Sequence, residues 1–373
     1  MKIALIAPLI ESVPPRLYGG TERIVSYLAE ELVRQGHAVT LFASGDSLTS
    51  AELVPCAPRA LRLDPTMRDP LPYYMVMLDR VRRRAHEFDA LHFHIDYLHF
   101  PLFRELAART LTTQHGRLDL PDLPVAYKVF HEYPLVSISN HQRQPCPDWH
   151  WVRTVHHGLP DHLCGFSPQA ADGYLAFLGR ICPEKRPDRA IEIARRAGLD
   201  LKIAAKVDPV DQRYFDEVIR PLLRHPGIEF IGEIGDHEKT AFLSGARALL
   251  FPIDWPEPFG LVMIEAMASG TPVIAWRCGS VPEVIEDGLT GFLVGDIESA
   301  VAAVHDLDRL DRAAIRARFA QRFTVRRMAE DYLAIYASST SRFELPISRP
   351  MLAAGIGQPG LGGNGPIEPA TAA

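Results

Sequence analysis

The sequence predicts an α/β protein built from two doubly wound domains that face each other across a cleft. Its 373 residues exceed what a single hydrophobic core usually fills. Two successive series of short apolar runs alternate with helical patterns, which is typical of parallel sheets covered by helices. The stretch 156–172 between the two series has no sustained periodicity and contains Pro and Gly, as expected of a hinge.

The first series begins with the apolar run 3–10. A helix follows, with Thr21 as its expected N-cap and Gly36 as its end, and Ile24, Val25, Leu28 and Leu32 share one of its faces. A strand at 38–43 completes a β-α-β unit. Beyond it we expect a helix near 73–88 and strands near 90–95, 110–114 and 135–138.

The second series repeats this architecture from a strand at 174–179 onward. Further strands are expected near 201–205, 228–231, 248–251, 272–275 and 291–294, and a helical pattern runs from about 312 to 338. The Gly-, Pro- and Ala-rich end cannot bury enough apolar surface to become ordered. We therefore expect a first domain at 1–160, a linker at 161–172, a second domain at 173–312, C-terminal helices at 313–340 and a disordered tail at 341–373.

Composition excludes several classes of protein. Forty Lys and Arg against 46 Asp and Glu give a net charge of −6, which argues against a nucleic-acid partner held by phosphate neutralisation. No apolar run reaches the roughly 20 residues of a membrane span, and the N-terminal run is too short for a signal peptide. The five cysteines form no Cys-x-x-Cys and indicate free thiols in a reducing compartment, so we expect a cytoplasmic protein.

The strongest motif is the segment 251–275, which is typical of a strand, a Pro-rich turn, a helix and another strand. Glu257 lies in the turn, and Glu265 lies about two turns or less along a helix that is otherwise largely apolar. A buried carboxylate needs hydrogen-bond donors, which the hydroxyl groups of one ligand would supply to both acids. The amides of Phe259, Gly260 and Leu261 at the helix start would face a phosphate. The alternative is a Pro-rich loop with a capping Glu.

This Glu-x7-Glu segment resembles the signature of retaining GT-B glycosyltransferases of family 4 (group 1), and the resemblance extends over nearly the whole expected ordered chain. It implies that Glu257 contacts hydroxyl groups of the transferred sugar and that Glu265 holds the ribose of the nucleotide. Pro258 belongs to the same substrate-binding turn. It also implies that the final helices cross back to the N-terminal domain, which would hold the acceptor.

Basic residues follow two strands of the second series. Arg180 and Lys185 stand in a loop similar to the family's Gly-Arg-x4-Lys, and the resemblance implies that they clamp the diphosphate. Negative charge accumulates on a leaving diphosphate, so cations there stabilise the transition state more than the ground state. Lys206 would add a further cation near the phosphate. Taken alone, such residues are more often solvated surface groups.

Gly19 and Gly20 lie between the first strand and the first helix, where glycines let backbone amides approach a phosphate. The alternative is a tight turn, but the family has a Gly-Gly loop here that contacts the donor diphosphate. The pattern is not Gly-x-Gly-x-x-Gly, which weakens the case for a dehydrogenase.

Histidines follow the strands of the first series. His92 and His94 share one face of a strand, but no third and fourth ligand at metal-site spacing accompany them, so we expect no metal. His94 best matches the family's histidine beside the sugar. His115 and Ser139 stand in two further strand-end elements that resemble the family's, and His157 replaces the Asn of its hinge.

We therefore expect a retaining, metal-independent transferase without a cofactor, which moves a sugar from a nucleotide-diphosphate sugar to a hydroxyl of a lipid, glycan or small molecule. Asp306 and Asp308 form an Asp-x-Asp, but in an acidic helical stretch typical of a solvated face. Arg80–Arg84, near Tyr73, Tyr74 and Met77, suggest either a solvated helix or contact with the inner face of a membrane. Alternatives to the transferase are a sugar-nucleotide epimerase, a phosphorylase and a noncatalytic nucleotide-sugar-binding protein.

Overall fold

The computed structural model describes residues 1–16, 19–163, 165–170 and 173–340. The expected tail at 341–373, the last two residues of the expected linker, Tyr18 and Cys164 lie outside the described residues. The other four cysteines, Cys56, Cys146, Cys182 and Cys278, are free thiols.

The first sheet has seven parallel strands in the order β3-β2-β1-β4-β5-β6-β7. They are β1 (Lys2–Ile6), β2 (Ala38–Ser44), β3 (Glu52–Ala57), β4 (Ala90–Phe93), β5 (Thr110–Thr113), β6 (Leu135–Ser137) and β7 (Trp151–Thr154). The helices of this half are α1 (Gly20–Arg34), α2 (Leu71–Arg84), α3 (Phe100–Phe103) and α4 (Leu123–Val129). Buried apolar residues lie on both faces of the sheet, as is typical of doubly wound folds.

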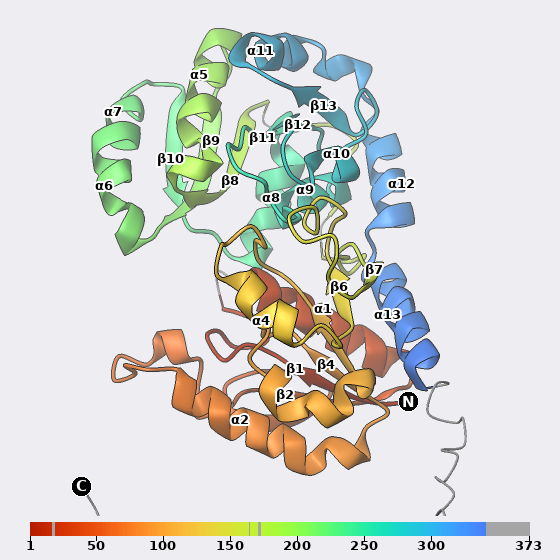
Figure 1. The fold of residues 1–373 in the computed structure, drawn as a ribbon. Helices are drawn as coiled ribbons and strands as arrows, with labels where there is room; N and C mark the ends of the chain where they lie inside the picture. The colour runs from red at the N-terminus through yellow and green to blue at the C-terminus, as the bar shows by residue number, and fades with distance from the viewer. Residues whose placement is uncertain (17–18, 164, 171–172, 341–373) are drawn as a thin grey trace, which may run out of the picture.

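The second sheet has six parallel strands in the order β10-β9-β8-β11-β12-β13. They are β8 (Leu175–Ile181), β9 (Leu201–Val207), β10 (Ile228–Gly232), β11 (Ala248–Phe251), β12 (Val273–Trp276) and β13 (Gly291–Val294). The helices are α5 (Pro187–Ala197), α6 (Gln212–Tyr214), α7 (Arg220–Leu222), α8 (Asp236–Gly245), α9 (Leu261–Ala268), α10 (Val281–Val284) and α11 (Ile297–His305). Figure 1 shows this half above the first, with α1 at the top of the lower half.

The predicted alternation of strands and helices is confirmed, with three corrections. Two strands, β3 and β7, were not predicted. Both lie at the edges of the sheet; β3 contains Pro55, and β7 has no buried residue. Thr21 is not the N-cap of the first helix, because α1 begins at Gly20 and Gly19 occupies the cap position. The predicted apolar face of α1 is fully buried at Ile24, Val25, Leu28 and Leu32.

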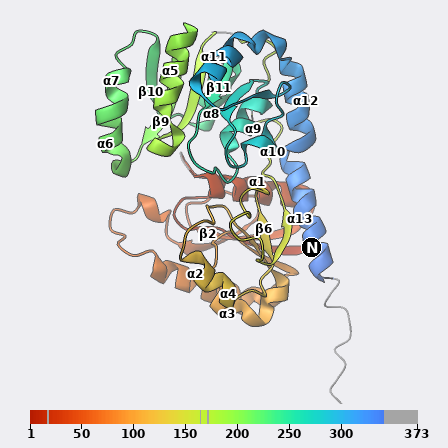
Figure 2. The ribbon, with the colours of Figure 1, turned by 45° about the horizontal axis from the view of Figure 1, so that its top comes forward.

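The chain crosses between the two halves twice, and the two crossings touch. Helix α12 (Arg312–Arg322) packs on α9, and α13 (Val325–Thr340) packs on α1 of the first half, so the last helices return as expected (Figure 2). Leu159 in the first crossing donates to the Phe323 carbonyl at 2.8 Å and accepts from the Val325 amide at 2.8 Å. A Cβ on Gly158 would lie 2.2 Å from the Thr324 oxygen, so only glycine fits.

Helix α2 has the contacts of a solvated helix. Arg82, Arg83 and Arg84 pair with Glu105, Asp79 and both Glu52 and Glu87, while Tyr74 and Met77 are buried in the core. These contacts pair three of the four arginines of the run with carboxylates, and the fourth, Arg80, donates to the Pro55 carbonyl. Among the described residues, no helix combines the length and the apolar character needed to cross a bilayer.

Candidate active site

A cavity of about 420 Å³ lies between the carboxyl ends of the two sheets. Loops from both halves line it, as expected where two doubly wound domains face each other. Of the residues predicted from the sequence, twelve line this cavity: Gly19, Gly20, His115, Arg180, Lys185, Lys206, Glu257, Pro258, Phe259, Gly260, Leu261 and Glu265. His94 and Ser139 do not line it.

The three predicted cations extend from the ends of β8 and β9 and each contacts a carboxylate. Arg180 lies 3.5 Å from Asp208 and 3.7 Å from Asp211, and Lys206 lies 2.5 Å from Asp208. Lys185, in the turn after β8, contacts the Glu257 carboxylate. The cations are therefore concentrated on one wall of the cavity and already have anionic partners.

Glu257 is held at the cavity by the loop that follows β12. The Ser280 amide donates to the Glu257 carbonyl at 3.0 Å, and the Ser280 hydroxyl donates to the Phe259 carbonyl at 2.8 Å. A Cβ on Gly279 would lie 2.4 Å from the Glu257 nitrogen, so this loop packs directly on the turn. Gly279 and Ser280 do not line the cavity; they support the turn from behind. The Trp255 indole donates to the Glu257 carboxylate at 3.1 Å.

Glu265 lies on α9, as predicted, and is 5% exposed. Its Oε1 atom lies 3.5 Å from Arg23 of α1 and 3.3 Å from Lys239 of α8. The sequence predicts that hydroxyl groups of a ligand donate to this buried acid, whereas in the structure Arg23 and Lys239 already pair with it. Because Arg23 comes from the first half, this contact also joins the two halves beside the cavity.

Two helices begin at the cavity wall. Gly260, the N-cap of α9, has φ of +81°, and a Cβ there would approach Met263 to 2.8 Å, so the sharp entry into the helix requires glycine. A Cβ on Gly20, at the start of α1, would lie 3.7 Å from Leu261. The starts of α1 and α9 thus approach each other, and the unpaired amides of a helix start attract anions.

The histidine wall comes from the first half. His115 and His157 line the cavity, with ring centroids 5.4 Å apart and an interplanar angle of 16°. His94 lies behind them, 3% exposed, with its Nδ1 2.9 Å from Nε2 of His115. His92 lies on β4 and His94 directly follows its last residue, and their rings lie side by side with centroids 4.0 Å apart.

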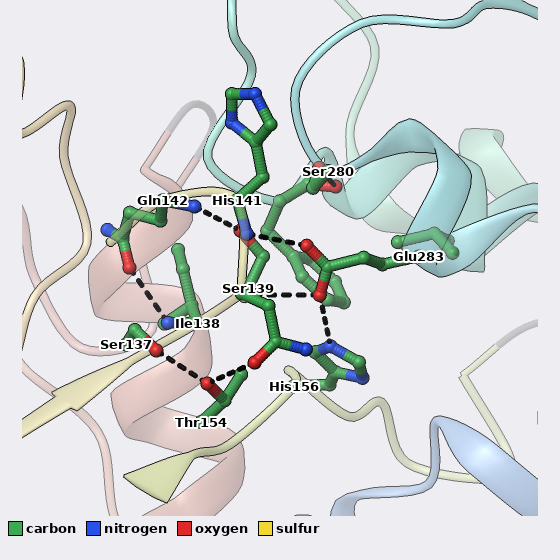
Figure 3. Close-up of polar contacts among 12 residues, drawn as sticks. Ser137, Ile138, Ser139, His141, Gln142, Thr154, His156, Ser280 and Glu283 are labelled. Atoms are coloured by element: carbon green, nitrogen blue, oxygen red, sulfur yellow. Dashed lines mark hydrogen bonds and ion pairs between the residues drawn. The ribbon is translucent and has the colours of Figure 1, made fainter. Parts of the chain in front are cut away.

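Ser139 lies beside the cavity in a contact between the halves (Figure 3). Its side chain is fully buried, and its hydroxyl oxygen accepts from the Gln142 amide at 3.0 Å, which fixes a turn. At this turn Glu283 of α10 accepts from the amides of Asn140 at 2.7 Å and His141 at 2.6 Å, and its carboxylate lies 3.2 Å from the His156 ring. The position predicted as a ligand contact is therefore placed to hold this turn.

In the described part of the chain, no cluster of three or more His, Cys, Asp or Glu side chains is arranged to hold a metal ion. The two carboxylates of the Asp-x-Asp pair form ion pairs with arginines at the surface, as expected of a solvated stretch. Asp306 lies 3.0 Å from Arg309, and Asp308 lies 3.3 Å from Arg247.

Sequence reasoning missed Arg23, Lys239 and Glu233, which also line the cavity, and treated His157 only as a departure from the hinge pattern. One signal was available. The chain has only six lysines, and Lys185, Lys206 and Lys239 all line this cavity. Arg23 gave no signal, because it lies on the first turn of a helix where a basic residue is usually solvated.

Two family models match adjacent parts of the chain. The model of Glycosyltransferase Family 4 matches residues 18–186, and the model of Glycosyl transferases group 1 matches residues 168–322. The two matches meet near the start of the second sheet, so each describes one half of the molecule.

Relatives extend the comparison. D-inositol 3-phosphate glycosyltransferase of Nocardia farcinica is 34% identical over 194 residues, 45% of this chain and 41% of that protein. Phosphatidyl-myo-inositol mannosyltransferase of Mycobacterium leprae is 27% identical over 346 residues, 81% of this chain and 86% of that protein. For several of the curated relatives it matches, the chain spans about half of their length or less.

Among solved structures, Anabaena HepE in complex with UDP and glucose superimposes with a TM-score of 0.70 at 18% identity, covering 91% of this chain and 100% of that one. At this identity the likeness shows the fold, which is the two-domain GT-B architecture. The two matched models, which together span residues 18–322, identify the chain as a member of glycosyltransferase family 4, the glycosyl transferases of group 1.

Proposed function

We propose that the protein transfers a sugar from a nucleotide-diphosphate sugar to an acceptor hydroxyl, with retention of the anomeric configuration. The observation that carries this proposal is the meeting of Arg180, Lys185, Glu257 and Glu265 in one cavity between the two sheets. The family to which the chain belongs supports the same reaction class.

Arg180 and Lys185 would bind the diphosphate. Negative charge builds on the diphosphate as the bond to the sugar breaks, so cations fixed at this place lower the barrier. Their contacts with Asp208 and Glu257 hold both side chains at the cavity. A diphosphate would therefore bind by taking over cations whose positions are already restricted, which reduces the entropic cost of binding.

Glu257 would accept hydrogen bonds from hydroxyl groups of the sugar once the diphosphate has drawn Lys185 away. Glu265, between Arg23 and Lys239, would accept from the ribose hydroxyls. The two acids thus address opposite ends of one donor, with the cations between them.

Retention would follow from a displacement on one face of the sugar. A retaining hydrolase needs a second carboxylate as nucleophile. Among the described residues, the carboxylates that line the cavity are Glu233, Glu257 and Glu265, all from the second half, and the wall from the first half presents glycines, Thr21, Arg23 and two imidazoles. In a same-face displacement the leaving diphosphate oxygen takes the acceptor proton, so no separate base is needed.

Relatives guide the choice of ligands. The HepE structure was solved with UDP and glucose, and both sequence relatives named above are described by inositol-containing acceptors. We propose a polyol acceptor bound by the first half, in the cytoplasm, where the four described cysteines would stay reduced. The paired arginines of α2 give no support to a membrane surface as partner.

The experiment is a thermal-shift screen with UDP-, GDP- and ADP-sugars, followed by turnover with an acceptor panel that includes D-inositol 3-phosphate and phosphatidylinositol. A donor at 100 times its Kd should stabilise the fold by about 2.7 kcal/mol. Product without any acceptor would instead indicate an epimerase. Stabilisation without turnover across the panel would favour a noncatalytic binding protein, and absence of stabilisation by every donor would refute the proposal.

A further inference from the structure

Four imidazoles lie together at the carboxyl ends of β4, β5 and the edge strand β7 of the first sheet. His92, His94, His115 and His157 form a row in which neighbouring ring centroids are 4.0, 5.1 and 5.4 Å apart. His115 and His157 reach the cavity, whereas His92 and His94 lie in the protein interior. The proposed reaction uses no base, so the row needs another explanation.

The inner end of the row is fixed by α13. Nδ1 of His92 lies 2.7 Å from the Tyr336 hydroxyl, and Nε2 lies 2.8 Å from the Thr113 hydroxyl, which lies 3.0 Å from the Tyr332 hydroxyl. Both nitrogens of His92 are therefore satisfied. Helix α13, the last helix in the described part of the chain, thus anchors the strands that present His94 and His115.

His94 has one contact and one unsatisfied nitrogen. Its Nδ1 lies 2.9 Å from Nε2 of His115, whereas its own Nε2 is buried and has no hydrogen-bond partner in the described part of the chain. Nδ1 of His115 makes no hydrogen bond to a described residue, is not a buried atom, and belongs to a ring that lines the cavity.

The hydrogen bond between Nδ1 of His94 and Nε2 of His115 requires that one of these two nitrogens carries a proton and that the other accepts it. Burial lowers the pKa of His94 well below its usual value and that of His115 to about 3, so both rings are neutral near pH 7. Either His94 donates from Nδ1, or His115 donates from Nε2. In the second case His94 would carry its proton on the buried, unpartnered Nε2. Burying an unpaired N–H is rare and costly, and the first arrangement avoids it.

We infer that His94 is a positioning residue, which donates from Nδ1 to Nε2 of His115 and so fixes the tautomer in which His115 presents an N–H at Nδ1 to the cavity. His115 then offers a hydrogen-bond donor to a hydroxyl or phosphoryl oxygen of the bound donor. The stacked ring of His157 holds the plane of His115. The hydrogen bond from His115 to an oxygen of the bound donor rests on the proposed function, whereas the tautomer of His115 does not.

The tautomer is measured directly by two-bond 1H–15N correlation spectra of the full chain labelled with 15N-histidine, at pH 7.5. His115 should show a protonated Nδ1 and an unprotonated Nε2, and its signals are identified by their loss in His115→Asn. A protonated Nε2 on His115 would overturn the inference, whether or not any sugar donor is turned over.

Variants at His94 test the consequence for turnover. His94→Asn keeps an amide that can donate to His115, whereas His94→Asp offers only an acceptor and should force the proton onto Nε2 of His115. We expect His94→Asn to retain turnover within about tenfold, and His94→Asp to lose about 10²-fold or more at pH 8, as for removal of one transition-state donor. On lowering the pH, protonation of His115 beside the new carboxylate would restore the Nδ1–H, so the His94→Asp variant should regain activity.

His99 provides the matched control. It is also fully buried at this edge of the sheet, where it stacks on Phe93 at 3.7 Å and contacts the Thr112 hydroxyl at 3.1 Å, and it does not line the cavity. His99→Asp measures the general effect of a buried carboxylate and should show no recovery of activity at low pH. Equal turnover of His94→Asn and His94→Asp, with the same pH profile as the control, would overturn the inference. If the unmodified protein turned over none of the donors, the proposed function would be refuted. The spectra would still decide which nitrogen of His115 carries the proton.

Discussion

The two halves of the molecule share a topology and differ in the chemistry at their carboxyl edges. From β3 to β6 the first sheet has the same strand order as the whole second sheet, and it adds β7 at one edge. The second half brings Arg180, Lys185 and Lys206, together with the carboxylates that pair with them, to its edge. The first half brings neutral, buried imidazoles. The same backbone plan therefore places a wall rich in charged strand-end residues opposite a wall of glycines and imidazoles, to which Arg23 of α1 adds one cation.

The largest expected effect comes from removing Arg180 and Lys185, two cations of the second half that line the cavity. In the variant Arg180→Ala/Lys185→Ala we expect turnover to fall by about 10⁴-fold, because each lost transition-state cation costs roughly 10²–10³-fold. Isothermal titration should show weaker binding of nucleoside diphosphates and nearly unchanged binding of nucleosides. Arg195→Ala is the control, since Arg195 contacts Glu192 on the surface of α5. Equal losses for diphosphates and nucleosides would contradict the assignment.

We expect acid to destabilise the first half of the molecule before the second half. Burial lowers the pKa of His92, His94, His99, His115 and His157. Their folded pKa values lie below the ordinary 6.5, so between these values the unfolded chain binds more protons and stability falls as the pH falls below 6.5. Each imidazole contributes about 1 kcal/mol between pH 6.5 and 5.5.

Three carboxyl groups of the same half act in the opposite direction. Burial raises the pKa of Glu11 and Glu22 and raises that of Asp96 to about 6, so the folded state binds these protons earlier than the unfolded chain. We expect a net loss of stability over this range, because five imidazoles oppose three carboxyl groups. Hydrogen exchange at pH 6.5 and 5.5 should show protection lost in β1, β4 and β5 before β8 and β9; simultaneous loss would remove the contrast between the halves.

Glu257→Gln separates sugar recognition from diphosphate binding. The amide keeps the shape but loses the charge, so we expect turnover to fall by about 10²-fold. Nucleoside diphosphate should bind no more weakly, because Glu257 no longer competes for Lys185. Turnover and calorimetry with the free diphosphate measure the two effects. A parallel loss of turnover and nucleotide affinity would show that Glu257 acts on the diphosphate rather than on the sugar.

The smallest expected effect concerns Glu283 of α10, which joins the second half to the turn at Asn140 and His141 of the first half. Although burial acts to raise it, the hydrogen bonds from His156 and from the Asn140 and His141 amides lower the pKa of Glu283, so it is charged at neutral pH. Glu283→Gln should weaken this contact by about 1–2 kcal/mol. Small-angle scattering would detect a more open shape, and donor affinity should fall by up to about tenfold. Glu298→Gln, at a surface pair with Arg196, should change neither quantity.

Much of the fold could be predicted because strands buried on both faces give continuous apolar runs, and helices buried on one face give a periodic apolar pattern. The run Leu249–Phe251 and the apolar face of α1 left little ambiguity. The two edge strands of the first sheet could not be predicted, since β3 and β7 bury few side chains and lack a continuous apolar run, whereas the edge strands β10 and β13 were predicted. The ligand contact of Ser139 stays a prediction: Ser139 follows a strand whose carboxyl end faces the cleft, but the turn after that strand buries its side chain, which accepts from the Gln142 amide.

The sequence by itself determined the two-sheet architecture and the segment that carries Glu257 and Glu265, because both depend on residues close together in the chain. Only the tertiary structure decided that Arg23 and Lys239 pair with Glu265, and that His115 rather than His94 lines the cavity. Such contacts join residues far apart in the chain, and hydrogen bonds and ion pairs act only over a few ångströms. Their partners are therefore fixed by how the two halves pack, which no local pattern records.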